Sequence, residues 1–279
     1  MSQKIISPLA KPFLKWAGGK RQLVKDLIKY KPKKYTTYYE PFLGGGALLL
    51  ELQPQQAVIN DSNSELINCY SIVKNALNEL IDELKQYKND EDYYYEVRQW
   101  DREKDYALRT AIEKAARIIF LNKTCYNGLF RVNSQGQFNV PFGRYKKPNI
   151  LDEAVLKAVS NYLNKAQIEL LNTDFAEAVK TASKNDFIYF DPPYDPVSST
   201  SSFTGYDVNG FDRHQQKRLK EVIDDLTDRG CQVMLSNSDT DFIIDLYQDY
   251  NLVKVSATRA INSKASRRGK VGEVILMNY

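Results

Sequence analysis

The chain has 279 residues, 43% of them hydrophobic, and a formal net charge of +4, which together predict a soluble globular protein with one large or two small domains. No stretch approaches the roughly 20 apolar residues that cross a bilayer, and the N-terminus has no apolar signal core, so we expect a cytoplasmic protein without a membrane segment. Three cysteines without a C-x-x-C pair, and a single His214, lead us to expect free thiols and no structural zinc site.

Basic residues are concentrated in a few segments of the sequence. Residues 1–34 contain ten Lys or Arg and one acid, Asp26. Residues 259–270 contain five Lys or Arg and no acidic residue. Residues 144–147 add three more, and residues 90–105 are instead rich in acids. Such segregation is typical of a one-sided contact with a polyanion, although an ordinary solvated surface gives the same pattern.

The N-terminal part of the chain predicts a β-α-β unit. Residues 20–30 have the pattern of a short helix. Residues 38–42 are expected to be extended, followed by a glycine turn at 44–46, a helix at 47–52, and a strand at 57–61 that ends in an acid. Units of this kind form a parallel, doubly wound sheet.

The middle of the chain has a helical pattern followed by a long aperiodic segment. Apolar residues at 66–80 and at 112–120 recur at helical spacings, which predicts helices that pack in a core. Residues 122–148 are rich in Asn, Gly and aromatics, and a loop of that length is usually functional or disordered. Its aromatic content argues against disorder. We therefore expect a mostly helical insertion over residues 63–151.

Further strands are expected after the insertion. They are residues 167–172, 186–190, 231–237, 251–257 and 272–279. A helix begins near Asp212, and no helix separates the last two strands, so these should form an antiparallel hairpin at one edge. The sequence thus predicts an open α/β sheet interrupted by a helical insertion.

Two candidate ligand contacts lie at the carboxyl ends of predicted strands, where doubly wound sheets bind ligands. The glycine turn in EPFLGGG, residues 40–46, lets backbone approach a ligand, and the next helix offers its N-terminal N–H groups. A packing role for these glycines is equally consistent, and the chain has neither the G-x-G-x-x-G fingerprint nor a phosphate loop. Asp61 stands where an acid could hold ribose hydroxyls or could cap the next helix.

The most specific motif is Asp-Pro-Pro-Tyr at residues 191–194, directly after an apolar strand. Pro192 and Pro193 end the strand ladder and stiffen the turn, which keeps the Pro192 carbonyl out of strand pairing. The Asp191 carboxylate and that carbonyl are both acceptors and can hold the two N–H groups of an exocyclic amine. Tyr194 offers a ring on which a planar base can stack, a contribution of about 1–3 kcal/mol.

Five motifs extend over nearly the whole chain. They are FLKWAGGK (13–20), EPFLGGGALL (40–49), AVINDSNSELIN (57–68), YNGLFRVNSQGQFNVPFGRYKKP (126–148) and YFDPPY (189–194). In this order they resemble the D12 class of DNA adenine N6-methyltransferases, the Dam type, whose usual target is GATC. The resemblance implies a Rossmann-like S-adenosylmethionine-dependent methyltransferase sheet in residues 1–62 and 152–279. It also implies an inserted target-recognition domain in residues 63–151.

By position, the resemblance implies that S-adenosylmethionine is the ligand of the glycine turn, which explains the missing phosphate loop because this cofactor has no phosphates. The implied cofactor contacts are Trp16, Lys20, Phe42, Gly44, Gly46, Asp61 and Asp191. The implied catalytic group is Asp191, Pro192 and Tyr194, which hold the N6 amine and receive a flipped-out adenine. Many relatives have Ala where Gly45 stands, a change expected to be harmless.

The resemblance also implies contacts of the insertion with double-stranded DNA. The residues implied to read or wedge open the bases are Tyr126, Asn127, Leu129, Arg131, Pro141 and Tyr145, with Lys15 as a further base contact and Arg144 as a phosphate contact. Arg131 can reach guanine O6 and N7 as a bidentate donor, while Tyr126 and Leu129 can fill the opened stack.

Alternatives stay open at the level of the sequence. Related amine methyltransferases act on cytosine, usually with Ser in place of Asp191, or on glutamine, with Asn. A non-enzymatic DNA-binding protein could keep the fold, but it has no need of the complete set Trp16, Lys20, Asp61 and Asp191. A solitary enzyme and a restriction–modification enzyme both fit the sequence, and we expect no metal and no obligate protein partner.

Overall fold

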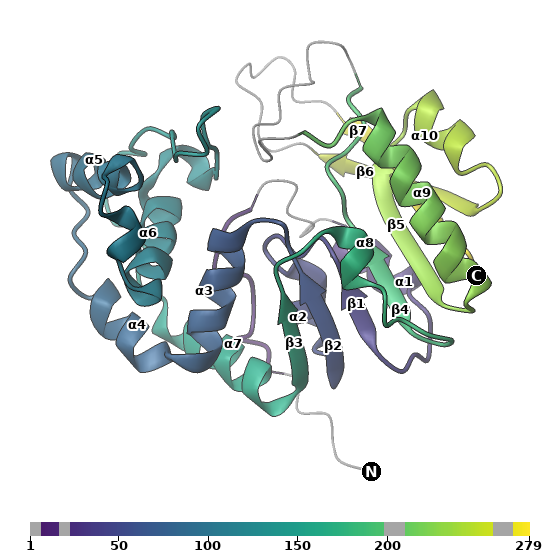
Figure 1. The fold of residues 1–279 in the computed structure, drawn as a ribbon, viewed down its shortest axis with the longest axis horizontal. Coiled ribbons are helices and arrows are strands. Elements are labelled where there is room, and N and C mark those ends of the chain that lie inside the picture. Colours follow the sequence, from purple (N-terminus) through teal and green to yellow (C-terminus); the bar gives the residue numbers. More distant parts are fainter. Residues whose placement is uncertain (1–6, 17–22, 198–209, 259–269) are drawn as a thin grey trace.

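The fold is seen in a computed structural model that describes residues 7–16, 23–197, 210–258 and 270–279. Within these residues, seven strands form one sheet in the order β3-β2-β1-β4-β5-β7-β6 (Figure 1). Their bounds are β1 Tyr38–Glu40, β2 Gln56–Asn60, β3 Gln167–Leu171, β4 Phe187–Phe190, β5 Gln232–Ser238, β6 Asn251–Thr258 and β7 Lys270–Met277.

The strands from β3 to β5 are parallel, and β7 runs antiparallel between β5 and β6. The predicted antiparallel hairpin of the last two strands is therefore confirmed. The order reverses between β1 and β4, because the chain winds outward from β1 to β3 and then returns to β4 on the other side of β1. In a doubly wound sheet, the carboxyl ends of the strands at such a switch point form a ligand crevice.

Helices cover both faces of the sheet, which gives three layers. One face packs against α1 (Val24–Tyr30), α2 (Ala47–Leu52), α3 (Ser64–Asn75) and α7 (Glu153–Lys165). The opposite face packs against α8 (Phe175–Ala178), α9 (Arg213–Asp228) and α10 (Asp241–Leu246). Neighbouring strand residues point to opposite faces, so Tyr38 and Tyr39 belong to different halves of the core.

The chain between α3 and α7 is mostly helical up to residue 128. Its elements are α4 (Leu77–Leu84), α5 (Glu91–Gln99) and α6 (Ala111–Thr124), with 3₁₀ turns at Trp100–Arg102, Tyr106–Leu108 and Tyr126–Gly128. In Figure 1 these helices lie beside the sheet, next to α3 and away from the β6–β7 edge. Because α3 packs on both α6 and α7, this first helix of the expected insertion contacts the later insertion helices and the sheet layer alike. The domain boundary at residue 63 stays a prediction.

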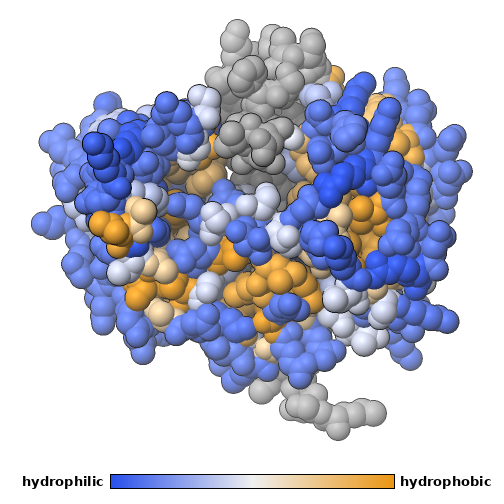
Figure 2. All heavy atoms as spheres, viewed as in Figure 1, coloured by the Kyte–Doolittle hydropathy of each residue, from blue (hydrophilic) through white to orange (hydrophobic). Residues whose placement is uncertain are grey.

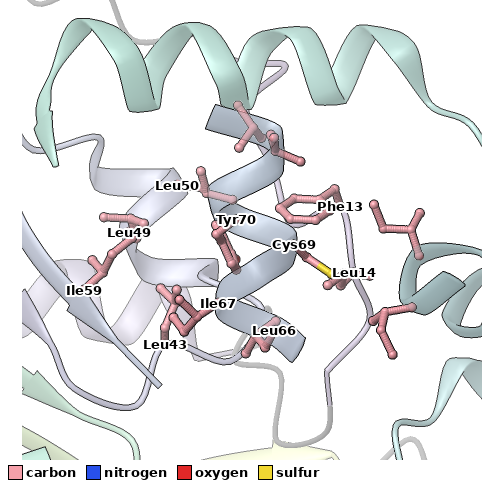
Figure 3. Close-up of a cluster of buried hydrophobic side chains, with 14 of the residues drawn as sticks. Phe13, Leu14, Leu43, Leu49, Leu50, Ile59, Leu66, Ile67, Cys69 and Tyr70 are labelled. Carbon is pink, nitrogen blue, oxygen red and sulfur yellow. The ribbon is translucent and has the colours of Figure 1, made fainter. Parts of the chain in front are cut away.

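The N-terminal segment at residues 7–16 is fixed against α3. The Phe13 ring lies 5.0 Å from the Tyr70 ring, edge to face, and Leu14 is buried. Figure 3 shows both rings within a cluster that includes Leu49 of α2 and Ile59 of β2. Edge-to-face aromatic pairs stabilise a core beyond the area they bury. Residues 15 and 16 therefore follow an anchored stretch of chain.

Most predicted elements are confirmed, with differences at their ends. The strand predicted at 38–42 is regular only to Glu40, and the helix predicted at 20–30 is described from Val24, since residues 20–22 lie outside the described part. The apolar stripe at 66–80 is divided at Ala76, whose φ of −142° is not helical, and so forms α3 and α4. Helices α5, α7, α8 and α10 are additional.

The surface and the cysteines agree with the composition. The face drawn in Figure 2 is largely hydrophilic, and its hydrophobic residues form several patches, one of them near the middle, over β2 and β3 in the same view. All three cysteines are buried free thiols, as predicted.

Among the described residues, no helix has the length and apolar character needed to cross a bilayer, and no cluster of His, Cys, Asp or Glu is arranged for a metal ion.

Candidate active site

The glycine turn after β1 is tied to the end of β2 by Asp61. Gly44 and Gly46 have φ values of +50° and +63°, a left-handed conformation that favours glycine. The Gly44 N–H donates to Asp61 Oδ2 (2.9 Å), and the Asn63 N–H donates to Asp61 Oδ1 (2.9 Å). Asn63 itself caps α3 by accepting from the Leu66 N–H. The alternative that Asp61 caps this helix is therefore wrong, and its carboxylate instead joins the glycine turn to the turn after β2.

Trp16 and Phe42 provide aromatic surfaces beside the glycine turn. A Cβ atom on Gly44 would lie 3.0 Å from Trp16 Cδ1, so the indole packs directly on the turn. The Trp16 ring also stacks on Phe130, with ring centroids 4.6 Å apart. Phe42 packs into the opposite half of the core, beside α8. Lys20, the remaining predicted cofactor contact in this region, lies outside the described residues.

The glycines are also required by packing. A Cβ atom on Gly46 would lie 2.6 Å from the Tyr70 hydroxyl oxygen, which is closer than side chains tolerate. The packing role proposed as an alternative is thus present, and it is compatible with close approach of a ligand to the turn.

Asp191 directly follows β4, beside the switch point. The Ser236 hydroxyl donates to Asp191 Oδ1 (3.0 Å), and the Tyr189 hydroxyl lies 2.9 Å from Ser236 Oγ. Burial raises the pKa of Tyr189 well above its ordinary value, so this hydroxyl stays protonated, and it donates to Ser236 because the single Ser236 proton goes to Asp191. The two hydroxyls therefore orient the Asp191 carboxylate from within the sheet. Among the described residues, none donates a hydrogen bond to the carbonyl of Pro192, which lies outside the strand.

The turn that carries Tyr194 is held by α9 and β7. The Tyr194 hydroxyl donates to Glu273 Oε2 (3.1 Å), and burial raises the pKa of Tyr194, which keeps the hydroxyl protonated. Gln216 Nε2 donates to the Pro193 carbonyl (2.8 Å). These bonds fix the residue before the ring and the tip of the ring itself. The stiffness predicted from the two prolines is thus reinforced by long-range contacts.

Glu40 brings a further carboxyl group close to the site. It is the last residue of β1, is 3% exposed, and accepts a hydrogen bond from the Tyr38 hydroxyl (2.8 Å). Burial, together with the charges of Asp191 and Asp61, raises the pKa of Glu40 to about 8 against the opposing effect of the bond from Tyr38. The carboxyl is therefore mostly protonated at neutral pH, which avoids another negative charge beside Asp61 and Asp191.

Replacement of Glu40 by Gln is expected to remove part of the pH dependence of stability. The folded state retains this proton up to about pH 8, whereas the unfolded state releases it near pH 4.5, so the folded state binds more protons in between. The stabilisation is fully present below pH 4.5 and is lost as the pH rises toward 8, with a slope of up to about 1.4 kcal/mol per pH unit. Urea denaturation across this interval should show a shallower profile for Glu40→Gln. Parallel profiles would show that Glu40 is ionised in the folded protein.

The residues predicted to contact DNA lie on the irregular segment after α6. Tyr126 is 54% exposed, and Asn127 beside it has a left-handed φ of +58°. Of the others, Arg131, Pro141 and Arg144 are exposed, and Leu129 and Tyr145 are half-buried. Lys15 reaches the same segment from the N-terminal side, since its Nζ lies 5.9 Å from the centre of the Tyr145 ring.

Arg131 is oriented across a short hairpin by Asn139. Arg131 Nε donates to Asn139 Oδ1 (2.7 Å), and Arg131 Nη2 donates to the Asn139 carbonyl (3.1 Å). The neighbouring Phe138 N–H donates to Asp101 Oδ2 (2.7 Å), and Asp101 forms an ion pair (2.7 Å) with Arg117, which is 1% exposed. Part of the acidic stretch at 90–105 therefore supports the hairpin and is not simply solvated surface.

These features define a doubly wound α/β protein in which the glycine turn, Asp61 and Asp191 follow strands next to the switch point, where sheets of this kind bind ligands. The chain matches the model of the D12 class N6 adenine-specific DNA methyltransferases over residues 16–261. It therefore belongs to this family and is an adenine-specific DNA methyltransferase. This result excludes the alternatives of a cytosine or glutamine methyltransferase and of a non-enzymatic DNA-binding protein.

Similar proteins match nearly the whole chain. The Type II methyltransferase M1.LlaDCHI of Lactococcus lactis subsp. cremoris is 48% identical, covering 96% of this chain and 95% of its own length. The Type II methyltransferase M.MjaIII of Methanocaldococcus jannaschii is 42% identical, and the match covers 96% of this chain and 99% of that protein. The DNA adenine methylase of Escherichia coli strain K12 is 36% identical, and the match covers 95% of this chain and 94% of that protein. Names from restriction–modification systems and names of DNA adenine methylases thus both occur among the relatives.

Proposed function

We propose that the chain transfers a methyl group from S-adenosylmethionine to N6 of a flipped-out adenine within GATC in double-stranded DNA. The observation that carries this proposal is the position of Asp191 and Pro192 at the end of β4, beside the turn at Gly44 and the Asp61 carboxylate. The proposed acceptor pair for an amine and the proposed cofactor contacts therefore come from the carboxyl ends of neighbouring strands in one sheet, which supports the proposal.

The residues of the crevice fit S-adenosylmethionine. The left-handed, half-buried Gly44 lets a ligand approach the turn closely above the buried Gly46, the Asp61 carboxylate can accept hydrogen bonds from ribose hydroxyls, and Trp16 and Phe42 offer apolar surfaces. Lys20 is proposed as a further contact from the sequence alone. When bound, the cofactor supplies an electrophilic methyl group on a sulfonium.

The proposed role of the Asp-Pro-Pro-Tyr turn is to prepare the adenine amine for attack. The N6 lone pair is delocalised into the ring, which makes the amine a poor nucleophile. If Asp191 and the Pro192 carbonyl accept its two N–H bonds, the nitrogen becomes pyramidal and its lone pair points toward the methyl group. Because Ser236 fixes the carboxylate in advance, little reorganisation is needed. Tyr194, held by Glu273, offers the surface on which the flipped base stacks.

The proposed recognition surface lies on residues 126–145 together with Lys15. Exposed Tyr126 suits a wedge that fills the space left by the flipped base, and Leu129 lies close to it in the chain. Arg131, oriented by Asn139, suits bidentate contact with a guanine. The remaining proposed contacts are Asn127, Pro141, Arg144 and Tyr145.

Incubation with radiolabelled S-adenosylmethionine and two duplexes that differ only in one GATC site tests the proposal. We expect label in N6-methyladenine of the GATC duplex alone. Label in both duplexes would contradict the specificity and keep the reaction. Absence of label in either duplex, with cofactor binding shown by calorimetry, would indicate a different target sequence.

A further inference from the structure

One buried side chain joins the N-terminal segment to the turn that begins the proposed recognition surface. Asn122, near the end of α6, is 1% exposed. Its Oδ1 accepts from the Lys15 N–H (2.8 Å), and its Nδ2 donates to the Lys15 carbonyl (2.7 Å) and to the Gly128 carbonyl (3.1 Å). The amide thus pairs with both backbone groups of Lys15 and also bonds to the turn, although Lys15 lies 107 positions away in the sequence.

The two segments that Asn122 joins lead to different parts of the proposed site. On one side, Trp16 follows Lys15 and packs on Gly44 of the glycine turn. On the other side, Gly128 lies within the turn that carries the proposed wedge and base contacts. Asn122 therefore stands between the cofactor crevice and the surface proposed to read DNA.

Packing around Asn122 leaves little room for movement. Gly128 has a φ of +65°, and a Cβ atom there would lie 2.4 Å from Lys15 Cδ. The Trp16 ring stacks on Phe130, two residues beyond Gly128. Because close-packed interiors transmit displacement, a shift of Lys15 must be accompanied by a shift of this turn.

We propose that Asn122 is a positioning residue that sets sequence discrimination by holding Lys15 and the turn at Gly128 in one arrangement. This inference rests on the proposed function, because Lys15 and the residues around Gly128 are the proposed base contacts. A side chain that is 1% exposed has no surface for DNA or cofactor. Asn122 therefore acts through the backbone of residues whose side chains meet the bases. A correct site needs all of these contacts at once, so their misplacement weakens methylation of the correct site most.

Asn122→Ala is expected to lower kcat/KM for the GATC duplex by about 100-fold, the scale of a misplacement of 1 Å. For duplexes with one altered base pair we expect a much smaller loss, so the ratio between the two rate constants falls. A purely structural role of Asn122 would reduce both rate constants in the same proportion and would leave this ratio unchanged.

Asn278→Ala provides a matched control. Like Asn122, Asn278 accepts one backbone N–H bond, from Val233 (2.8 Å), and donates two bonds, to Thr227 Oγ1 (2.9 Å) and to the Cys231 carbonyl (2.9 Å). It has no hydrogen bond to Lys15 or Gly128. We expect Asn278→Ala to be less stable than the wild type but to keep the wild-type ratio of kcat/KM between the GATC duplex and the altered duplexes.

Gly128→Ala perturbs the same contact without changing the Asn122 side chain. Its Cβ atom must displace Lys15, so we expect the same loss of discrimination. Thermal unfolding and circular dichroism show which variants are folded under the assay conditions. The inference is overturned if folded Asn122→Ala and Gly128→Ala keep the wild-type ratio of kcat/KM between the GATC duplex and the altered duplexes. It is also overturned if this ratio falls as much in Asn278→Ala as in Asn122→Ala. A wild-type enzyme that methylates both duplexes equally overturns the GATC assignment and this inference with it, before any variant is made.

Discussion

Replacement of Asp191 by Ala is expected to abolish methyl transfer while duplex binding stays close to that of the wild type. The substitution removes the carboxylate proposed to accept an amine N–H, but it leaves the residues proposed to contact DNA unchanged. Loss of one positioned hydrogen-bonding group in an active site costs about 10²–10³-fold in kcat, and the lost orientation of the base adds to this. The measurement is single-turnover methylation of a GATC duplex at saturating cofactor, with duplex affinity measured in parallel.

Ser236→Ala serves as the graded comparison. It keeps the Asp191 carboxylate but removes the hydroxyl that donates to Oδ1 at 3.0 Å and the link to Tyr189. We expect kcat to fall by about tenfold, which corresponds to roughly 1.4 kcal/mol in the transition state, with no change in duplex affinity. An Asp191→Ala enzyme that retains turnover within tenfold of the wild type would refute the assigned role.

The fold could be predicted from the sequence where local patterns determine structure. The apolar run before Asp191 predicts a strand, and β4 (Phe187–Phe190) lies there because its four residues are buried on both faces of the sheet. The glycines at 44 and 46 predict a turn, and their left-handed φ values explain why. The alternation of these elements predicts a doubly wound α/β sheet, which the structure confirms, whereas the position of the site at the strand ends stays a prediction.

The supporting contacts of the site could not be predicted, because they join residues that are far apart in the chain. Ser236 meets Asp191 across 45 positions, and Glu273 meets Tyr194 across 79. Ser236 had one usable signal, since it lies near the carboxyl end of a predicted strand, where ligand contacts gather. No comparable signal marks Asn122, which lies within an apolar helical stripe and whose partners are backbone groups. The register that brings such pairs together depends on the whole sheet and not on any local pattern.

The ends of strands and helices also depend on contacts that the local sequence pattern does not show. Residues 41 and 42 continue an apolar pattern after β1, yet the strand ends at Glu40, because the chain turns there to bring Leu43 N–H to the Asn60 carbonyl (2.9 Å). That bond comes from the neighbouring strand end and is not visible in the sequence pattern. Tertiary hydrogen bonds of this kind override local propensity at the edge of the site.

Replacement of Arg131 by Ala is expected to relax specificity at one guanine of the target. Asn139 uses the Nε and one Nη2 hydrogen of the guanidinium, which has five N–H donors, so enough remain for the O6 and N7 acceptors of a guanine. A bidentate pair of this kind contributes about 1–3 kcal/mol of discrimination against the wrong base. The penalty for replacing that guanine should therefore shrink by this amount in Arg131→Ala, while the other positions keep theirs. The measurement is kcat/KM for a set of duplexes in which each base pair of the site is changed in turn.

Arg144→Ala separates base reading from phosphate contact. Arg144 is exposed, and its Nη2 lies 3.5 Å from Glu91 Oε1. Its left-handed φ of +52° costs a residue other than glycine some backbone strain. As a proposed phosphate contact, its loss should weaken binding of every duplex alike and reduce the slope of log affinity against log salt by about one. If Arg131→Ala instead weakens all duplexes equally and lowers the salt slope, Arg131 contacts phosphate, and the guanine must be read by another residue of this surface.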